Sequence, residues 1–411
     1  MTARISCAAL CVLLSLSTPA LAQEAPDDSE KARFQWGPIR FTPTLEITSL
    51  GRDSNVFNEV VNPKSDFTAA IGPAVKVWMR PARTRLTVTT GGQYVYFHEY
   101  ASQRAWNTHH ELNWEVPLAR VTPFVGGAFV NARERQGYEI DARVRRRDTS
   151  FVVGSKLRVS GKTELVGSYR QFELAYDDRE TVLGEELSER LDRRENRSTF
   201  QFRYALTPLT TFVTSVETSR DRFDSASFRD SNSVKVLPGF ELKPLALISG
   251  TVFVGYRQFN PLDERVPDYR GVVAAVRAKY TYSATRFEVN VDRDIAYSFE
   301  ETQPYYVLLD YGLTITQRIT HRWDVVGQGA LQRLGYRSVA TGPEPVGLPG
   351  ELLSARQDRV DRGRIFGGGV GYRLNEVTRL GFNVSHSRRE SASLLRAFEG
   401  TRIFGSITYG M

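Results

Sequence analysis

Cysteine is nearly absent from this 411-residue sequence, which contains only Cys7 and Cys11. Both lie near the start, within an apolar stretch over residues 5–16, so the rest of the chain can have neither a disulfide framework nor a thiolate metal site. One cation precedes this stretch, and the small-residue triplet Ala-Leu-Ala ends at residue 22. These features are typical of a secretory signal. We therefore expect residues 1–22 to be a cleaved signal peptide.

Long apolar runs are also absent. After the signal, no segment offers the roughly 20 uninterrupted apolar residues that a membrane helix needs. Mean hydropathy is −0.34 and 25% of residues are charged, which excludes a buried helical bundle but suits a barrel whose strands are half apolar. No Pro/Gly/Ser-rich linker divides the chain after about residue 38. We expect an acidic, disordered periplasmic leader over residues 23–38 and one large barrel over residues 39–411.

The sequence does have strict alternation of apolar and polar side chains, over stretches longer than ordinary soluble strands. Phe200, Phe202 and Tyr204 alternate with Gln201 and Arg203. The same pattern recurs almost to the last residue. One face of the final segment there carries Ile403, Gly405, Ile407, Tyr409 and Met411. Aromatic residues gather near the strand ends, as at membrane interfaces: Tyr94, Tyr96, Trp106, Trp114, Tyr280, Tyr282 and Tyr409. Each strand is thus predicted to have one face toward lipid and one toward water.

The links between these segments alternate between tight turns and long polar loops. Short periplasmic turns opposite long external loops are typical of outer-membrane barrels. Counting between links predicts an all-β fold: a single transmembrane antiparallel up-and-down β-barrel of about 18 strands, the first over residues 39–51 and the last over 397–411. The link at residues 100–103 is short for an external loop and is the least certain point of the register.

Arg52-Asp53-Ser54-Asn55-Val56-Phe57, just after the first strand, resembles the first loop of a porin-2-like outer-membrane β-barrel family associated with bacterial exopolysaccharide and capsule export. Segments 256–269, 283–286, 291–294 and 316–322 are also similar to later hairpins of that family. The resemblance covers most of the chain after the signal, through short and degenerate motifs. It implies a component of polysaccharide secretion that acts with a periplasmic export protein, and it carries over no catalytic residues. The terminal apolar strand resembles the signal read by the barrel-assembly machinery.

No motif indicates an enzyme, a cofactor or a metal site. The adjacent His109 and His110 point to opposite faces of a strand and cannot chelate one ion together. The Gly367-Gly368-Gly369 run lies within an alternating segment with no following helix, so we interpret it as part of a barrel wall and not as a phosphate cradle.

Charged residues at the alternate positions are predicted to line the lumen. They are Lys76, Arg85, Glu111, Glu115, Arg203, Lys235, Arg277, Lys279, Arg286, Glu288, Asp292 and Arg379, and Glu241 joins this tally. Cations outnumber anions among them, which would favour anionic solutes or an acidic polymer. A ladder of neutralising ion pairs that braces the wall is an equally good interpretation.

Two arginine runs, 145–147 and 193–194, are expected at the external rim, where they would contact outer-membrane lipid and the phosphates of lipopolysaccharide. Nucleic-acid binding is not expected, because these charges are spread around a tube and the signal directs the chain out of the cytoplasm.

We therefore expect a protein of the Gram-negative outer membrane that is not an enzyme. The leading hypothesis is export of exopolysaccharide with a periplasmic partner. A second is a general diffusion porin for small, possibly anionic solutes, and a third is a surface adhesin or structural barrel that uses its long loops. The third would be favoured if residues 177–193 or 338–356 converged on a cluster of acids and a histidine.

Overall fold

The computed structural model describes residues 29, 32–135, 137–244, 247–339 and 358–410. The expected signal peptide lies outside the described residues. So does most of the leader, but Phe34–Trp36 forms a short strand, β1, that pairs with β2. The expectation of disorder over residues 23–38 therefore fails for this part. Its alternate side chains pack beside those of β2, and the Phe34 and Phe41 rings stack with centroids 5.4 Å apart.

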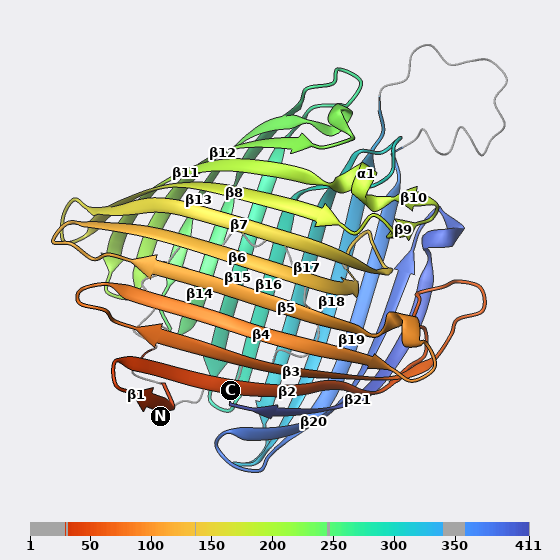
Figure 1. Cartoon of the computed structure of the whole chain (residues 1–411), viewed down its shortest axis with the longest axis horizontal. Coiled ribbons are helices and arrows are strands. Elements are labelled where there is room, and N and C mark those ends of the chain that lie inside the picture. The colour runs from red at the N-terminus through yellow and green to blue at the C-terminus, as the bar shows by residue number, and fades with distance from the viewer. Residues whose placement is uncertain (1–28, 30–31, 136, 245–246, 340–357, 411) are drawn as a thin grey trace.

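Eighteen long strands form one antiparallel sheet that closes on itself through pairing of its first and last members. Each strand pairs with its sequence neighbours, so the barrel is up-and-down (Figure 1). In chain order they are β2 (Ile39–Asp53), β3 (Asp66–Met79), β4 (Arg85–Phe97), β5 (Ala105–Glu115), β6 (Val121–Arg135), β7 (Arg143–Arg158), β8 (Thr163–Tyr176), β11 (Arg193–Thr207), β12 (Thr210–Phe223), β13 (Ser231–Leu242), β14 (Ile248–Pro261), β15 (Tyr269–Tyr282), β16 (Thr285–Tyr297), β17 (Tyr305–Arg318), β18 (Trp323–Arg337), β19 (Val360–Arg373), β20 (Thr378–Glu390) and β21 (Phe398–Tyr409). The predicted fold and strand number are confirmed.

The remaining elements are small and lie mostly in the loops. They are the hairpin β9 (Thr181–Val182) and β10 (Glu185–Glu186), the helix α1 (Leu187–Leu191), and the 3₁₀ turns Ala101–Gln103, Ser227–Arg229 and Leu394–Arg396. No helix among the described residues is long and apolar enough to cross a membrane.

Burial is distributed inside out along every long strand, which is the physical result of the alternation. In β13, Val234 and Val236 are exposed whereas the intervening Lys235 is only 7% exposed. In β11, Phe202 and Tyr204 are exposed and Arg203 is buried between them. Apolar side chains thus cover the outer wall and polar side chains fill the inner one, as hydrocarbon outside and water inside require.

The two ends of the barrel differ in the length of their links. Eight links of two to five residues form what we call the turn end, for example Pro208-Leu209. Nine longer links form the loop end, and they run from seven residues, as at 98–104, to 22 residues, at 338–359. The link predicted at 100–103 spans 98–104 in the structure and has the same length as five other loops: 136–142, 224–230, 262–268, 298–304 and 391–397.

Candidate functional site

Most of the charged side chains predicted to line the lumen are paired with an opposite charge. Arg203 makes a two-pronged contact with Glu241, with N···O distances of 2.9 and 2.6 Å. Lys235 lies 3.1 Å from Glu217 and 3.3 Å from Asp294. The other predicted residues that form ion pairs are Arg277 with Asp292, Lys279 and Arg286 with Glu288, Glu115 with Lys156, and Arg379 with Asp324.

Three predicted positions are held differently. Glu111 accepts a hydrogen bond from the Asn113 side chain at 2.8 Å. Lys76 lies over the Trp78 ring, and Arg85 faces Glu115 across the β4–β5 register. The role of all twelve residues in solute passage stays a prediction.

The sequence tally left out several acids that pair with the predicted cations. Glu164, Glu217, Asp294 and Asp324 all contact the predicted cations. Alternation alone assigns each of these acids to the same face as its partner, so a complete reading of every strand would have found them. Along the middle of the wall, the structure therefore favours the interpretation of a neutralising ladder of ion pairs.

Arginine gathers without matching acid at the turn end of the lumen. A cavity of about 50 Å³ there is lined by Arg286, Arg318, Arg373 and Arg379, together with Asp324. Asp324 is buried and binds two of them, at 3.4 Å from Arg373 and by a two-pronged contact with Arg379. Four guanidinium groups and one buried carboxylate thus line the same cavity, and Glu288 lies 3.9 Å from Arg286.

A glycine opposite this cluster makes room for it. A Cβ added to Gly371 would lie 2.0 Å from the Arg379 Nη2 atom. Any larger residue at 371 would therefore displace the guanidinium from its place in the cavity.

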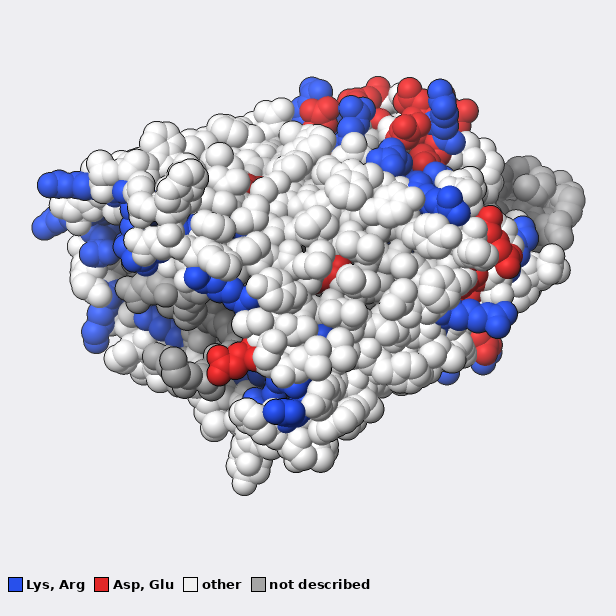
Figure 2. All heavy atoms as spheres, turned by 60° about the horizontal axis from the view of Figure 1, so that its bottom comes forward, with Lys and Arg blue, Asp and Glu red and all other residues white. Residues whose placement is uncertain are grey.

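The turns at the same end are basic as well. They hold one acid, Glu376, against six basic residues: Arg80, Arg83, Arg120, Lys162, Lys243 and Arg322. Figure 2 shows a broad uncharged band on the outer wall, mostly basic groups at the turn end, and basic and acidic groups together at the loop end. The field at the turn end is therefore positive over both the lumen and its rim.

At the loop end, the loop between β6 and β7 crosses the mouth of the barrel. Glu139 of this loop accepts hydrogen bonds from the Ser298 hydroxyl at 2.6 Å and the Phe299 amide at 3.2 Å. Both partners lie in the β16–β17 loop. Around the barrel, β7 and β16 are separated by the six strands β8, β11, β12, β13, β14 and β15, and β6 and β17 by the remaining eight. The contact therefore joins nearly opposite sides of the wall.

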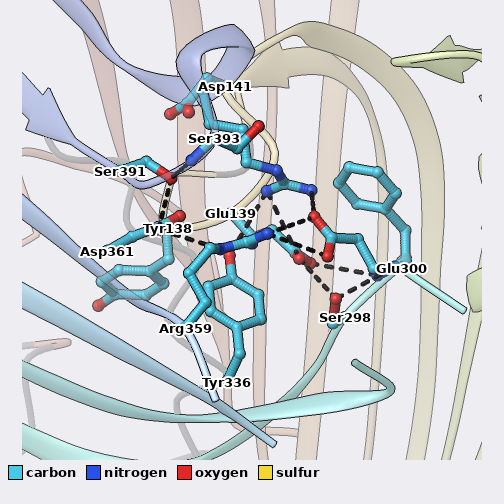
Figure 3. A network of polar contacts seen from close by, with 12 residues as sticks. Tyr138, Glu139, Asp141, Ser298, Glu300, Tyr336, Arg359, Asp361, Ser391 and Ser393 are labelled. Atoms are coloured by element: carbon cyan, nitrogen blue, oxygen red, sulfur yellow. Dashed lines mark hydrogen bonds and ion pairs between the residues drawn. The ribbon is translucent and has the colours of Figure 1, made fainter. Parts of the chain in front are cut away.

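Three arginines fix this crossing loop. Figure 3 shows one of them, Arg359, beside Glu300 and Asp361. Arg389 donates to the Tyr138 carbonyl at 2.8 Å and pairs with Asp141 and Asp361. Arg396 pairs with Glu139 and Glu300. Arg359 lies 3.0 Å from Glu300 and 3.1 Å from Asp361. We call these seven charged residues the mouth lock: Glu139, Asp141, Glu300, Arg359, Asp361, Arg389 and Arg396.

The mouth lock contains four acids and three arginines. Burial raises the pKa of Asp141 to about 6, although the Arg389 guanidinium beside it opposes the shift. Burial likewise raises the pKa of Glu139, against the attraction of Arg396. Desolvation is the main cause of both raised pKa values, and repulsion from Asp361 and Glu300 adds to it.

An apolar cluster packs beneath the same loops. Ile140, Leu187, Leu191, Ala226 and Phe299 are all buried in it, and they come from four different loops. Phe299 therefore contacts both parts of the closure, because its backbone amide binds Glu139 while its ring joins the apolar cluster. The loops are held together by apolar burial as well as by the mouth lock.

Sequence reasoning missed the mouth lock because its partners are far apart in the chain. Asp141 and Arg389 are separated by 248 residues, and no spacing pattern links a loop to a strand on the far side of a barrel. The sequence near Arg389 gave only a weak sign of the mouth lock. Arg389 is at an inward position of a predicted strand, and the residue that faces it is Gly363 and not an acid.

The two predicted rim runs are only partly external. Arg146 pairs with Asp148, and Arg193 is buried and lies 3.8 Å from Asp221. Both side chains point to the inner face because alternation sends every second member of a run inward. The expectation that 145–147 and 193–194 lie entirely at the outer rim is therefore wrong for these two residues.

The long loops bring no acid and histidine cluster together in the described part of the chain. Residues 177–192 contain no histidine, and 340–357 lie outside the described residues.

The chain also resembles known proteins. A family model described as "Putative beta-barrel porin 2" matches residues 35–409. No curated protein matches the sequence. Similar solved structures include a BenF-like porin from Pseudomonas fluorescens Pf-5, at 10% identity and TM-score 0.48, covering 91% of this chain and 99% of that one. OccK2 (OpdF) of Pseudomonas aeruginosa in complex with glucuronate is 9% identical, at TM-score 0.48 over 90% and 98%. The siderophore receptor PirA of Acinetobacter baumannii is 9% identical, at TM-score 0.46 over 90% and 80%.

Proposed function

Since this chain belongs to the family described as "Putative beta-barrel porin 2" and forms a porin-like barrel of the outer membrane, we propose that it is a channel for anionic solutes whose external mouth is closed by its own loops. The turn end faces the periplasm and the loop end faces the outside. Anions would gather at the periplasmic mouth and pass outward, or leave there after inward passage, whenever the loops move apart.

One observation carries the choice of anions: four arginines and a single buried acid line the cavity at the periplasmic mouth. Guanidinium groups bind carboxylate and phosphate through paired hydrogen bonds. In a tube with low-dielectric walls, such a cluster raises the local concentration of anions and repels cations. The ion pairs along the middle of the lumen would supply polar contacts to a passing anion without adding a second strongly charged region.

Selectivity in planar bilayers tests this proposal. A variant in which residues 138–141 are replaced by two glycines removes the crossing loop and gives an open background for measurement. Under a potassium chloride gradient, we expect its reversal potential to show preference for chloride. Adding Arg286→Gln and Arg318→Gln should reduce that preference about two- to fourfold, whereas Arg322→Gln, in the adjacent turn outside the cavity, should change it much less. A cation-selective open background would refute the proposal.

Export of an acidic exopolysaccharide is a second candidate function. The observation that favours it is the six-to-one excess of basic over acidic residues in the periplasmic turns, which suits an acidic polymer or an acidic periplasmic export partner. A barrel that waits for a partner also needs a closed outer mouth. Deletion of the gene should then lower polysaccharide at the cell surface and raise it in the periplasm. Unchanged surface polysaccharide would reject export and leave the channel proposal standing.

A further inference from the structure

Four arginines point outward on neighbouring strands near the loop end. They are Arg333 of β18, Arg362 and Arg364 of β19, and Arg388 of β20, and all four are exposed. The residues on either side of them point inward: Asp361 and Arg389 are buried in the mouth lock. The outer wall therefore carries a patch of guanidinium groups on the opposite side of the strands from that lock. We call the four residues the arginine patch.

The register places like charges face to face within the patch. Arg333 is opposite Arg362, and Arg364 is opposite Arg388. Directly opposed like charges destabilise a sheet, so the fold itself gains nothing from this arrangement.

Two acids border one side of the patch. Glu390 lies 3.7 Å from Arg364 and 3.5 Å from Arg388, and Glu399 is opposite Arg388 in the register. Glu399 also lies 3.6 Å from His386. Among the described residues, Arg333 and Arg362 have no ion pair. Arg362 is opposite Glu390 in the β19–β20 register but forms no ion pair with it, so the least neutralised positive charge of the patch lies on Arg333 and Arg362.

The height of the patch on the wall coincides with the end of the apolar band. Leu331, Phe366 and Val384 are exposed on the same faces of the same three strands. Leu331 and Phe366 are each the next outward position below a patch arginine, roughly 7 Å along the strand. Arginine on the lipid face costs about 2–4 kcal/mol at the bilayer midplane but little near the interface. The patch thus lies where lipid headgroups meet the acyl chains of the outer leaflet.

Other parts of the same rim lack these features. On β4 and β5, the outward positions near the loop end are aromatic, namely Tyr94, Tyr96 and Trp106. On β7 to β12, two of the outward arginines have protein partners: Arg145 donates to Asn131 at 2.9 Å, and Arg194 lies 3.9 Å from Glu173. Arginines also face each other on β6–β7 and β11–β12, but at least one member of each of those pairs has an acidic partner. Among the described residues, Arg333 and Arg362 are the facing arginines of the outer wall that both lack an ion pair.

We propose that the arginine patch binds a phosphorylated, acylated sugar lipid of the outer leaflet, with the lipid phosphates between Arg333, Arg362 and Arg364 and the acyl chains along the apolar band. Phosphate oxygens match the forked geometry of guanidinium groups. Binding at this site would also offset the repulsion between the facing arginines. The proposal does not depend on what the lumen transports.

The test uses the full chain in detergent and fluorescently labelled diphosphorylated lipid A as the probe. Arg333→Gln with Arg362→Gln should weaken binding about tenfold. The matched control, Arg194→Gln with Arg220→Gln, removes two exposed rim arginines from β11 and β12 and should change affinity less than about twofold. Thermal stability of the patch variant should not fall, because the substitution removes a repulsive pair.

Three comparisons separate this site from a general attraction to anions. Dephosphorylated lipid A should bind about tenfold more weakly than the diphosphorylated form, and phosphatidylglycerol should not replace it. Inorganic phosphate at the concentration of the probe should not displace it, because phosphate lacks the chains that contact Leu331 and Phe366. Equal loss in the patch and control variants, equal binding of phosphatidylglycerol, or displacement by phosphate would each overturn the proposal.

Discussion

The external and periplasmic mouths of this barrel are built from the same strands but differ in their balance of acids and arginines. At the external mouth, acids and arginines occur in nearly equal number and are buried against one another across the opening, as Glu139 and Arg396 are. At the periplasmic mouth, arginines such as Arg318 outnumber the acids and line an open cavity. Matched, buried charge holds protein segments together, whereas unmatched charge near water is available to a ligand. From this difference we infer that one end closes the barrel and the other recognises the solute.

The largest expected effect is on closure. Arg389→Ala leaves the buried Asp361 and the partly buried Asp141 without their shared arginine, a loss of about 3–5 kcal/mol. The crossing loop should then open locally, while the strands stay paired. Hydrogen exchange of the amides at 138–141 should accelerate by more than about 100-fold. Arg337→Ala is the control, because its partner Asp358 is exposed; equal acceleration in both variants would contradict a special role for the mouth lock.

A somewhat smaller effect is expected from the apolar half of the closure. Leu187 is fully buried under the loops, so Leu187→Ala should cost about 2–4 kcal/mol through lost burial and the cavity left behind. Protease cleavage within 177–192 should become faster, and conductance through the external mouth should rise. Leu183, which is half exposed in the same loop, supplies the control Leu183→Ala. If cleavage is as slow as in the wild type, the loops are held by the ion pairs alone.

The closure should also depend on pH. Because burial raises the pKa of Asp141 from 3.8 to about 6 despite Arg389 and Arg396 nearby, the closed loop binds a proton more tightly than an open, solvated loop would. The contribution of Asp141 to closure is therefore complete below about pH 4 and is lost as the pH rises through about 6. Conductance should increase between pH 5 and pH 7. Asp141→Asn should flatten this profile, leaving only the dependence due to Glu139; an unchanged profile would exclude Asp141 as the titrating group.

The smallest expected effect is at the periplasmic mouth. A single substitution there tests whether the two ends of the barrel act separately. Gly371→Val should push Arg379 away from Asp324 and out of the cavity, since a Cβ alone would overlap the guanidinium. We expect anion preference of the loop-opened barrel to fall about twofold with closure of the unmodified barrel unchanged. Gly327→Val, where an added Cβ meets nothing within 4 Å, is the control. A change in closure caused by Gly371→Val would mean that the two ends are coupled.

The wall of the barrel could be predicted from sequence because its rule is local. Alternation such as Phe200 to Tyr204 identifies a strand and its lipid face without knowledge of any other part of the chain, and turn lengths then give the strand number. The ion pairs of the wall, such as Lys235 with Glu217, follow from the same rule once every inward position is counted.

Closure of the mouth could not be predicted, because it depends on where loops go after leaving the wall. Nothing near Glu139 in the sequence indicates Ser298 or Arg396 as its partner. The order Arg145-Arg146-Arg147 was likewise misread as one external cluster, since a run of like residues hides the alternation that separates Arg146 from its neighbours.

The central claim is that the external mouth is closed by the loop between β6 and β7. Single-channel conductance of the full chain in planar bilayers tests it most directly, compared with the variant in which two glycines replace residues 138–141. We predict rare, small openings for the wild type and stable openings at least about tenfold larger for the variant. A wild-type conductance as large and as steady as that of the variant would show that the loop does not close the barrel.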